Sequence, residues 1–167
     1  MHSRAFQLTG HKLPENQYLE ESDLNYEEGM PISIADYIQD SDRKEDIQWL
    51  LYYLKEKGVE GWSYDKAEQS LTFTKPFITS YFKQAYESFK KKAEEITLED
   101  FSQSFGAVSA YCLSSLIEER DGFYIFVGPS LTGFFRTMDS FVRSLNYELR
   151  GKDSVTFYIG GTLDYCC

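Results

Sequence analysis

Hydrophobic residues recur at two spacings along the chain, which predicts a mixture of strands and helices. Alternation at every second position marks Gly61–Tyr64 and Ser70–Thr74, which flank the polar stretch Asp65–Gln69. This arrangement is typical of a β-hairpin. Other short runs rich in β-branched and aromatic residues predict strands at Ser3–Leu8, at Phe123–Val127, and at Val155–Ile159 with a continuation at Thr162–Tyr165 after an interruption by Gly160 and Gly161.

Apolar residues spaced three or four positions apart predict the helices. The expected helices are a short one at Ser33–Gln39, two longer ones at Arg43–Lys57 and Pro76–Ile96, a fourth from Thr97 to Leu116, and a strongly amphipathic fifth at Ser130–Arg150. A strand at Ala107–Leu113 is an alternative to the middle of the fourth helix. The stretch 15–30 has no sustained period, so we expect a long loop there.

Two of these helices carry signals for their ends and for burial. Asp42 stands three residues before Glu45, as in a capping box, and Gly58 follows the same helix as a C-terminal stop. The segment Ile47–Leu54 is apolar on nearly every side, which predicts a centrally buried helix. In the helix after the hairpin we expect an inward-facing stripe of Phe77, Tyr81, Ala85, Phe89, Ala93 and Ile96.

The order of these elements predicts an α+β fold. We expect a single compact domain over residues 1–167, with a small sheet of about four to five strands covered by several helices. The strand–helix–strand unit at Phe123–Ile159 is a candidate for a right-handed parallel crossover. A chain of 167 residues suits one domain, because domains commonly contain about 100–200 residues.

Composition narrows the class of protein. Tyrosine and phenylalanine occur 13 times each, which supplies the apolar mass that a disordered chain lacks. The formal net charge of −10 argues against a general binder of nucleic acid or anionic membranes. No long apolar leader or membrane span is expected, and the unpaired set Cys112, Cys166 and Cys167 suits a reducing compartment. We therefore expect a cytoplasmic protein.

Common catalytic and metal-binding constellations are not expected. The two histidines, His2 and His11, lie near the N-terminus, and no cysteine stands at zinc-ligand spacing. The pair Asp40 and Asp42 lacks the glycine and the glutamate of a calcium-binding loop, and is expected at a helix start instead. The sequence thus predicts no catalytic residues, no cofactor and no metal.

One glycine-bearing turn supports an alternative function. The stretch Gly128–Gly133 follows a predicted strand and resembles the glycine spacing of a P-loop. The positions of the phosphate-binding lysine and the magnesium-binding hydroxyl are occupied by Phe134 and Phe135, so a working P-loop is excluded.

A weaker anion site at this predicted helix start is the alternative. It would use the N–H groups of the backbone together with Ser130, Thr132 and Arg136. Arg136, Arg143 and Arg150 are expected to form a basic stripe along the same helix. The alternative function is therefore a small ligand-binding domain or enzyme that acts on an anionic small molecule.

The distribution of charge supports the leading hypothesis. Residues 15–46 contain 11 acidic and two basic residues, a net charge of −9, so the other 135 residues together carry only −1. We expect 15–32 to be an acidic loop-like segment whose interleaved apolar residues hold it on the domain. The candidate partner-binding residues are Glu20, Glu21, Asp23, Glu27, Glu28, Asp36, Asp40 and Asp42.

A fixed array of carboxylates can compete with nucleic acid for a basic groove, because proteins that bind DNA or RNA contact the phosphates with lysine and arginine. The sequence therefore favours a non-enzymatic binding protein with a basic partner. Its sharpest form is an inhibitor of a nucleic-acid-acting protein, similar in character to nucleic-acid mimics, anti-restriction and anti-CRISPR proteins and acidic immunity proteins. The alternative to this hypothesis is an acidic loop that only aids solubility.

Overall fold

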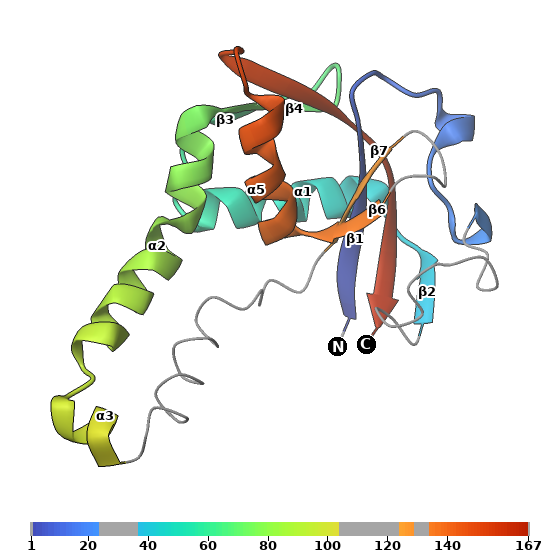
Figure 1. The fold of residues 1–167 in the computed structure, drawn as a ribbon. Coiled ribbons are helices and arrows are strands. Elements are labelled where there is room, and N and C mark those ends of the chain that lie inside the picture. The colour runs from blue at the N-terminus through green and yellow to red at the C-terminus, as the bar shows by residue number, and fades with distance from the viewer. Residues whose placement is uncertain (1, 24–36, 104–123, 129–133, 167) are drawn as a thin grey trace.

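The computed structural model describes residues 2–23, 37–103, 124–128 and 134–166. Figure 1 shows the helices and strands in these ranges. In chain order they are β1 (His2–Thr9), the 3-10 turns η1 (Glu15–Gln17) and η2 (Glu21–Asp23), β2 (Tyr37–Asp40), α1 (Arg43–Glu56), β3 (Trp62–Asp65), β4 (Ser70–Thr74), α2 (Lys75–Glu94), α3 (Leu98–Gln103), β5 (Tyr124–Val127), β6 (Phe134–Thr137), α5 (Met138–Glu148) and β7 (Ser154–Cys166).

The α+β fold predicted from the sequence is confirmed. The described strands form one seven-stranded sheet, larger than expected, in the order β3-β4-β7-β1-β5-β6, with β2 also paired to β7. Strand β1 runs parallel to β5, and the other pairs are antiparallel. Strand β7 is antiparallel to β1, and β1 is parallel to β5, so β5 and β7 run in opposite directions. The expected parallel crossover between those two strands is therefore wrong.

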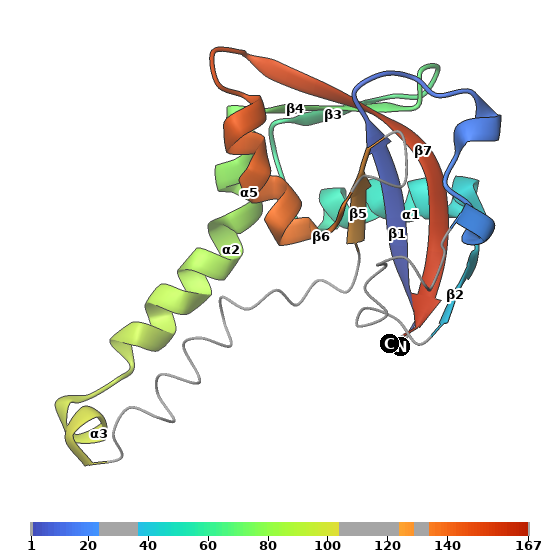
Figure 2. The ribbon, with the colours of Figure 1, turned by 45° about the vertical axis from the view of Figure 1, so that its right-hand side comes forward.

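Strand β7 organises the sheet. It has 13 residues, pairs with β1 along one side, and on its other side pairs first with β4 and then with β2. The expected interruption at Gly160 and Gly161 is wrong, because both glycines lie inside this strand. The register between β1 and β7 does shift between Phe6 and Leu8, close to these glycines. At the far end His2 pairs with Cys166, so the two ends of the described chain lie side by side (Figure 2).

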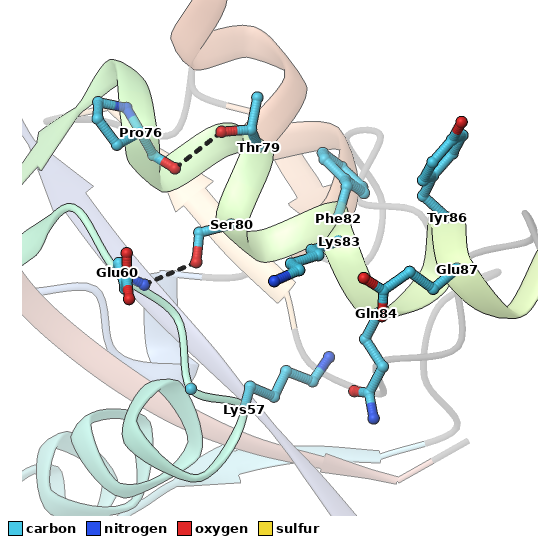
Figure 3. Close-up of a pocket in the computed structure, with 11 residues that line it drawn as sticks. Lys57, Glu60, Pro76, Thr79, Ser80, Phe82, Lys83, Gln84, Tyr86 and Glu87 are labelled. Atoms are coloured by element: carbon cyan, nitrogen blue, oxygen red, sulfur yellow. Dashed lines mark hydrogen bonds between the residues drawn. The ribbon is translucent and has the colours of Figure 1, made fainter.

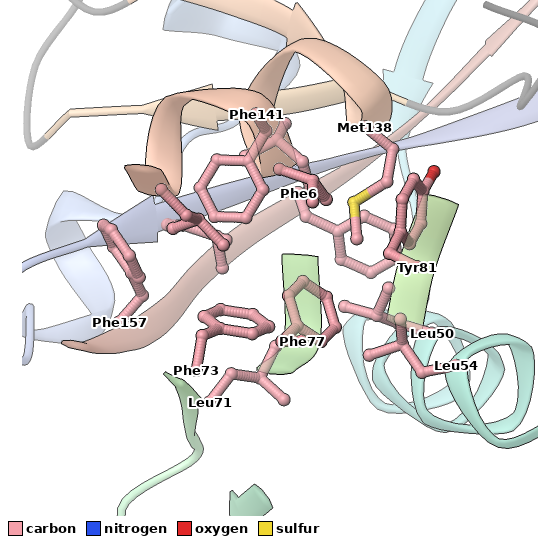
Figure 4. Packing of buried hydrophobic residues seen from close by; sticks show 14 of the residues in the cluster. Phe6, Leu50, Leu54, Leu71, Phe73, Phe77, Tyr81, Met138, Phe141 and Phe157 are labelled. Carbon is pink, nitrogen blue, oxygen red and sulfur yellow. The ribbon is translucent and has the colours of Figure 1, made fainter. Parts of the chain in front are cut away.

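The core joins the sheet to three helices, α1, α2 and α5 (Figure 4). Phe6 of β1 stacks on Trp49 of α1, with ring centroids 6.4 Å apart. Phe141 of α5 meets both Phe73 of β4 and Phe157 of β7 edge-on, at 5.9 and 5.5 Å. Aromatic residues from distant parts of the sequence therefore fill one cluster, and burial of their area is the main stabilising term.

Helix α1 is not buried centrally as its composition predicts. Ile47, Leu50 and Leu54 face the core, whereas Tyr52 is 61% exposed. The long helix after the hairpin is confirmed, but its inward stripe covers only the first turns, at Phe77 and Tyr81. Farther along the stripe Ala85 is exposed and Phe89, Ala93 and Ile96 are half-buried, because this end of α2 runs away from the sheet (Figure 1).

Two other expectations about helices are wrong. Tyr37–Gln39 belongs to strand β2, which is drawn into the sheet by pairing with the end of β7. Phe134–Thr137 forms strand β6 against β5, so the fifth expected helix begins at Met138, where the Thr137 hydroxyl accepts a hydrogen bond from Ser140 N. The predictions for 33–36, for 104–116 and for 130–133 lie outside the described residues.

Candidate acidic binding face

The start of α1 holds the first group of predicted binding residues. Asp42 caps the helix as expected, with its Oδ1 accepting hydrogen bonds from the N–H groups of Lys44 (2.9 Å) and Glu45 (3.1 Å). This cap satisfies N–H groups that have no partner within the helix and fixes the direction of the Asp42 carboxylate. Glu45 follows in the first turn and is exposed.

A partly buried ion pair lies beneath this helix start. Arg4 of β1 donates from Nε to Oδ1 of Asp46 at 2.7 Å, and Asp46 is only 5% exposed. Ser41 donates its hydroxyl to the other carboxylate oxygen of Asp46 at 2.5 Å. The Arg4 guanidinium also lies 4.6 Å from the centre of the Trp49 ring. A buried carboxylate must be paired and hydrogen-bonded, and these contacts meet that need for Asp46. The same contacts hold α1 against β1.

A hollow of about 360 Å³ opens beside this pair. Its lining contains five carboxylates and the single guanidinium of Arg4, and the lining residues are Arg4, Gln39, Asp40, Ser41, Asp42, Glu45, Asp46 and Asp164. Asp164 accepts a hydrogen bond from Gln39 Nε2 at 3.0 Å. Because the carboxylates of the lining outnumber its one guanidinium, which is already paired with Asp46, the local field is negative.

The turn η2 adds exposed acids next to this hollow. Glu21 N donates to Oδ1 of Asp40 at 2.8 Å, which ties η2 to β2. Glu20 N donates to Oδ2 of Asp23 at 2.9 Å, and Glu20, Glu21 and Asp23 are all exposed. We define the acidic face as the seven residues Glu20, Glu21, Asp23, Asp40, Asp42, Glu45 and Asp164.

The two basic residues of 15–46, Arg43 and Lys44, differ in where their side chains point. Arg43 turns inward, donating from Nε to Gly160 O and from Nη2 to Ile159 O, both at 2.6 Å. Its guanidinium also lies 4.7 Å from the centre of the Tyr18 ring. Lys44, in contrast, is exposed. The hydrogen-bonding capacity of Arg43 is therefore directed toward the sheet, and Lys44 is the cation that residues 15–46 present to solvent.

The structure brings together five of the eight predicted partner-binding residues, namely Glu20, Glu21, Asp23, Asp40 and Asp42. Glu27, Glu28 and Asp36 lie outside the described residues. Sequence reasoning missed Asp164 and Arg4, which join the site only because β1 and β2 both pair with β7. The sequence near Arg4 or Asp164 contains no pattern that predicts the pairing of β1 and β2 with β7.

The alternative anion site was expected at the start of the fifth helix, together with Arg136. Arg136 lies in β6 opposite Ile125, and the helix begins at Met138. Arg136 therefore does not share a helix with Arg143, and the expected basic stripe of three arginines is wrong. Ser130 and Thr132 lie outside the described residues.

A larger hollow of about 860 Å³ lies between the end of α1 and the start of α2 (Figure 3). Its charged lining residues are two lysines, Lys57 and Lys83, and two glutamates, Glu60 and Glu87. Lys57 Nζ lies 4.6 Å from the centre of the Tyr53 ring. Because positive and negative groups are equal in number here, this hollow has no charge preference comparable to that of the acidic face.

Three further findings concern metal sites, membrane-spanning helices and similarity to known proteins. In the part of the chain that the structure describes, no three or more His, Cys, Asp or Glu side chains are grouped to hold a metal ion. None of the described helices is both long enough and apolar enough to cross a membrane. No protein-family model, curated protein sequence or solved structure matches this chain.

Proposed function

We propose that this protein is a non-enzymatic binding protein that uses the acidic face to engage a basic partner. The observation that supports this most is the hollow at the start of α1, where five carboxylates share one opening and the only guanidinium in the lining is already paired with Asp46. Bringing a cationic side chain there relieves repulsion among the carboxylates, so association is favoured electrostatically.

The partner class that fits best is a protein with a lysine- and arginine-rich groove for nucleic acid. Such grooves are built to meet closely spaced phosphates. The acidic face offers closely spaced carboxylates whose positions are set by backbone hydrogen bonds, as at Asp42 and Asp40. The sharpest form of the proposal is therefore an inhibitor that occupies the groove of a nucleic-acid-acting enzyme.

The test is a salt-graded pull-down from a lysate of the cells in which the chain is made, read by mass spectrometry. One bait carries Glu20→Lys, Glu21→Lys and Glu45→Lys, which moves the formal net charge from −10 to −4. We expect the original chain to capture a basic nucleic-acid-binding protein that elutes early as salt rises, because salt screens exposed charges. The charge-reversed bait should not capture it.

A matched bait separates the acidic face from charge in general. Glu56→Lys, Glu87→Lys and Glu148→Lys change the net charge by the same amount at exposed positions on α1, α2 and α5. This control should capture the partner as the original chain does. Equal loss of capture in both variants, equal capture by all three baits, or no enriched basic protein would contradict the proposal.

A further inference from the structure

The first part of the acidic segment is fastened to the sheet by a buried glutamine. Gln7 of β1 is 2% exposed, and its Oε1 accepts two backbone hydrogen bonds, from Leu19 N at 2.9 Å and from Gly161 N at 2.8 Å. One side-chain oxygen therefore joins three stretches of chain that are distant in sequence. The Leu19 side chain is also buried, so both its backbone and its side chain are held.

The close approach at this point requires a residue without a side chain. A Cβ atom at Gly161 would lie 2.1 Å from Leu19 O and 2.7 Å from Leu19 N. A Cβ atom at Gly160 would lie 2.1 Å from Oε1 of Gln7. The two glycines inside β7 thus let the backbone of Leu19 and the amide of Gln7 rest directly on the strand.

Arg43 provides a second fastening from the first residue of α1. Its two hydrogen bonds go to carbonyl oxygens of Ile159 and Gly160, at the point where β7 has left β4 and has not yet met β2. Its guanidinium plane lies over the ring of Tyr18, the neighbour of Leu19. A planar group with several donors can make all these contacts at once, whereas a lysine cannot.

We propose that Gln7 and Arg43 are positioning residues for the acidic face. They hold Tyr18 and Leu19 against β7, and so set where Glu20, Glu21 and Asp23 stand relative to Asp40 and the start of α1. This inference rests on the proposed function, and it states that a partner meets a preformed array of carboxylates rather than a flexible acidic chain. Preformed groups lose less conformational entropy on binding, so affinity depends on the contacts of Gln7 and Arg43 as well as on the charge of the acidic face.

Two variants that preserve the net charge test the fastening. Gln7→Met removes the shared acceptor oxygen at a similar side-chain length. Arg43→Lys keeps the positive charge but lacks the planar guanidinium that donates to Ile159 O and Gly160 O. Hydrogen exchange should speed up on the order of tenfold at the amides of Leu19 and Glu21 in both variants. Titration with an oligo-arginine peptide at fixed ionic strength should show about tenfold weaker binding, because the segment must then be ordered by the ligand.

Control variants separate positioning from general damage. Gln17→Met makes the same replacement at an exposed position of η1, and Arg150→Lys does so at an exposed arginine after α5, so both should match the original chain. Should Gln7→Met fail to fold, the same two readings on Arg43→Lys decide the question.

The outcomes distinguish this inference from the proposed function. Unchanged affinity in Gln7→Met and Arg43→Lys, with binding lost in the triple charge reversal at Glu20, Glu21 and Glu45, would overturn the positioning role alone. Unchanged exchange at Leu19 in both variants would overturn it as well. Unchanged affinity in the triple charge reversal would overturn the proposed function, and the positioning role with it.

Discussion

At the scale of single residues, the acidic face depends on polar contacts between parts of the chain that are far apart in sequence. The ion pair of Asp46 with Arg4 spans 42 residues, and the hydrogen bond from Gly161 N to Gln7 spans 154. The glycine at the second of these contacts lies directly against the backbone of Leu19.

Gly161 gives a stability test at this scale. Gly161→Ala places a methyl group against the backbone of Leu19, and we expect it to lower the free energy of unfolding by about 3 kcal/mol, as for severe overpacking. Gly10→Ala is the matched control, because a Cβ atom there meets nothing within 4 Å. Urea denaturation measures both variants. Equal stability of the two would contradict the close contact between β7 and Leu19.

Tyr64 gives a test by pH. Burial raises the pKa of this phenol above its ordinary value of 10.0, opposed by the nearby Arg43 cation and assisted by Asp65. The unfolded chain therefore loses this proton at lower pH than the folded chain, so the stabilising effect is complete below pH 10.0 and is lost as pH rises through the folded pKa. Denaturation at alkaline pH should show a shallower loss of stability in Tyr64→Phe. Parallel profiles would contradict this assignment.

Whether a single contact could be predicted from the sequence depended on how local it is. Asp42 was predictable as a helix cap because its partners, Lys44 N and Glu45 N, lie two and three residues away. The pairs Asp46 with Arg4 and Gly161 with Gln7 are far apart in the chain, and no sequence spacing indicates them. The buried polar groups that shape the site were therefore not predicted.

At the scale of elements, periodicity predicted a helix or strand correctly wherever its local pattern fitted only one of the two structures. The hairpin of β3 and β4, the long helix after Pro76 and helix α1 were all predictable in this way. The stretch 134–137 was not, because its apolar residues also fit the helical period of the adjoining helix α5. Pairing with β5 decides in favour of a strand, as tertiary context commonly overrides local preference.

Helix α1 gives the test at this scale, because Asp42 is both its cap and a member of the acidic face. Asp42→Ala should lower the free energy of unfolding by about 1 kcal/mol, whereas Asp42→Asn keeps a side-chain acceptor and should cost only a few tenths. Both variants remove the carboxylate, so both should weaken binding of an oligo-arginine peptide by a similar factor. Chemical denaturation and calorimetric titration separate the two roles. Binding that tracks stability instead of charge would contradict the assignment of Asp42 to the face.

At the scale of the whole molecule, the acidic character was predictable but its shape was not. The concentration of charge in residues 15–46 is visible in the sequence. The fold adds Asp164 from the last strand, turns Arg43 toward β7, and uses Arg4 from the first strand to neutralise Asp46. Only the sheet order, with β7 between β1 and both β4 and β2, brings these pieces together.

The measurement that tests the central claim most directly is a residue-by-residue map of where a cationic ligand binds. Backbone amide signals of the isotopically labelled chain would be followed by NMR during titration with an oligo-arginine peptide at physiological salt. Among the residues that the structure describes, we predict saturating shifts confined to the amides of 19–23, 40–46 and 163–165. Shifts of equal size around Glu56, Glu87 and Glu148, or no saturable shifts, would show that the acidic face is not a binding surface.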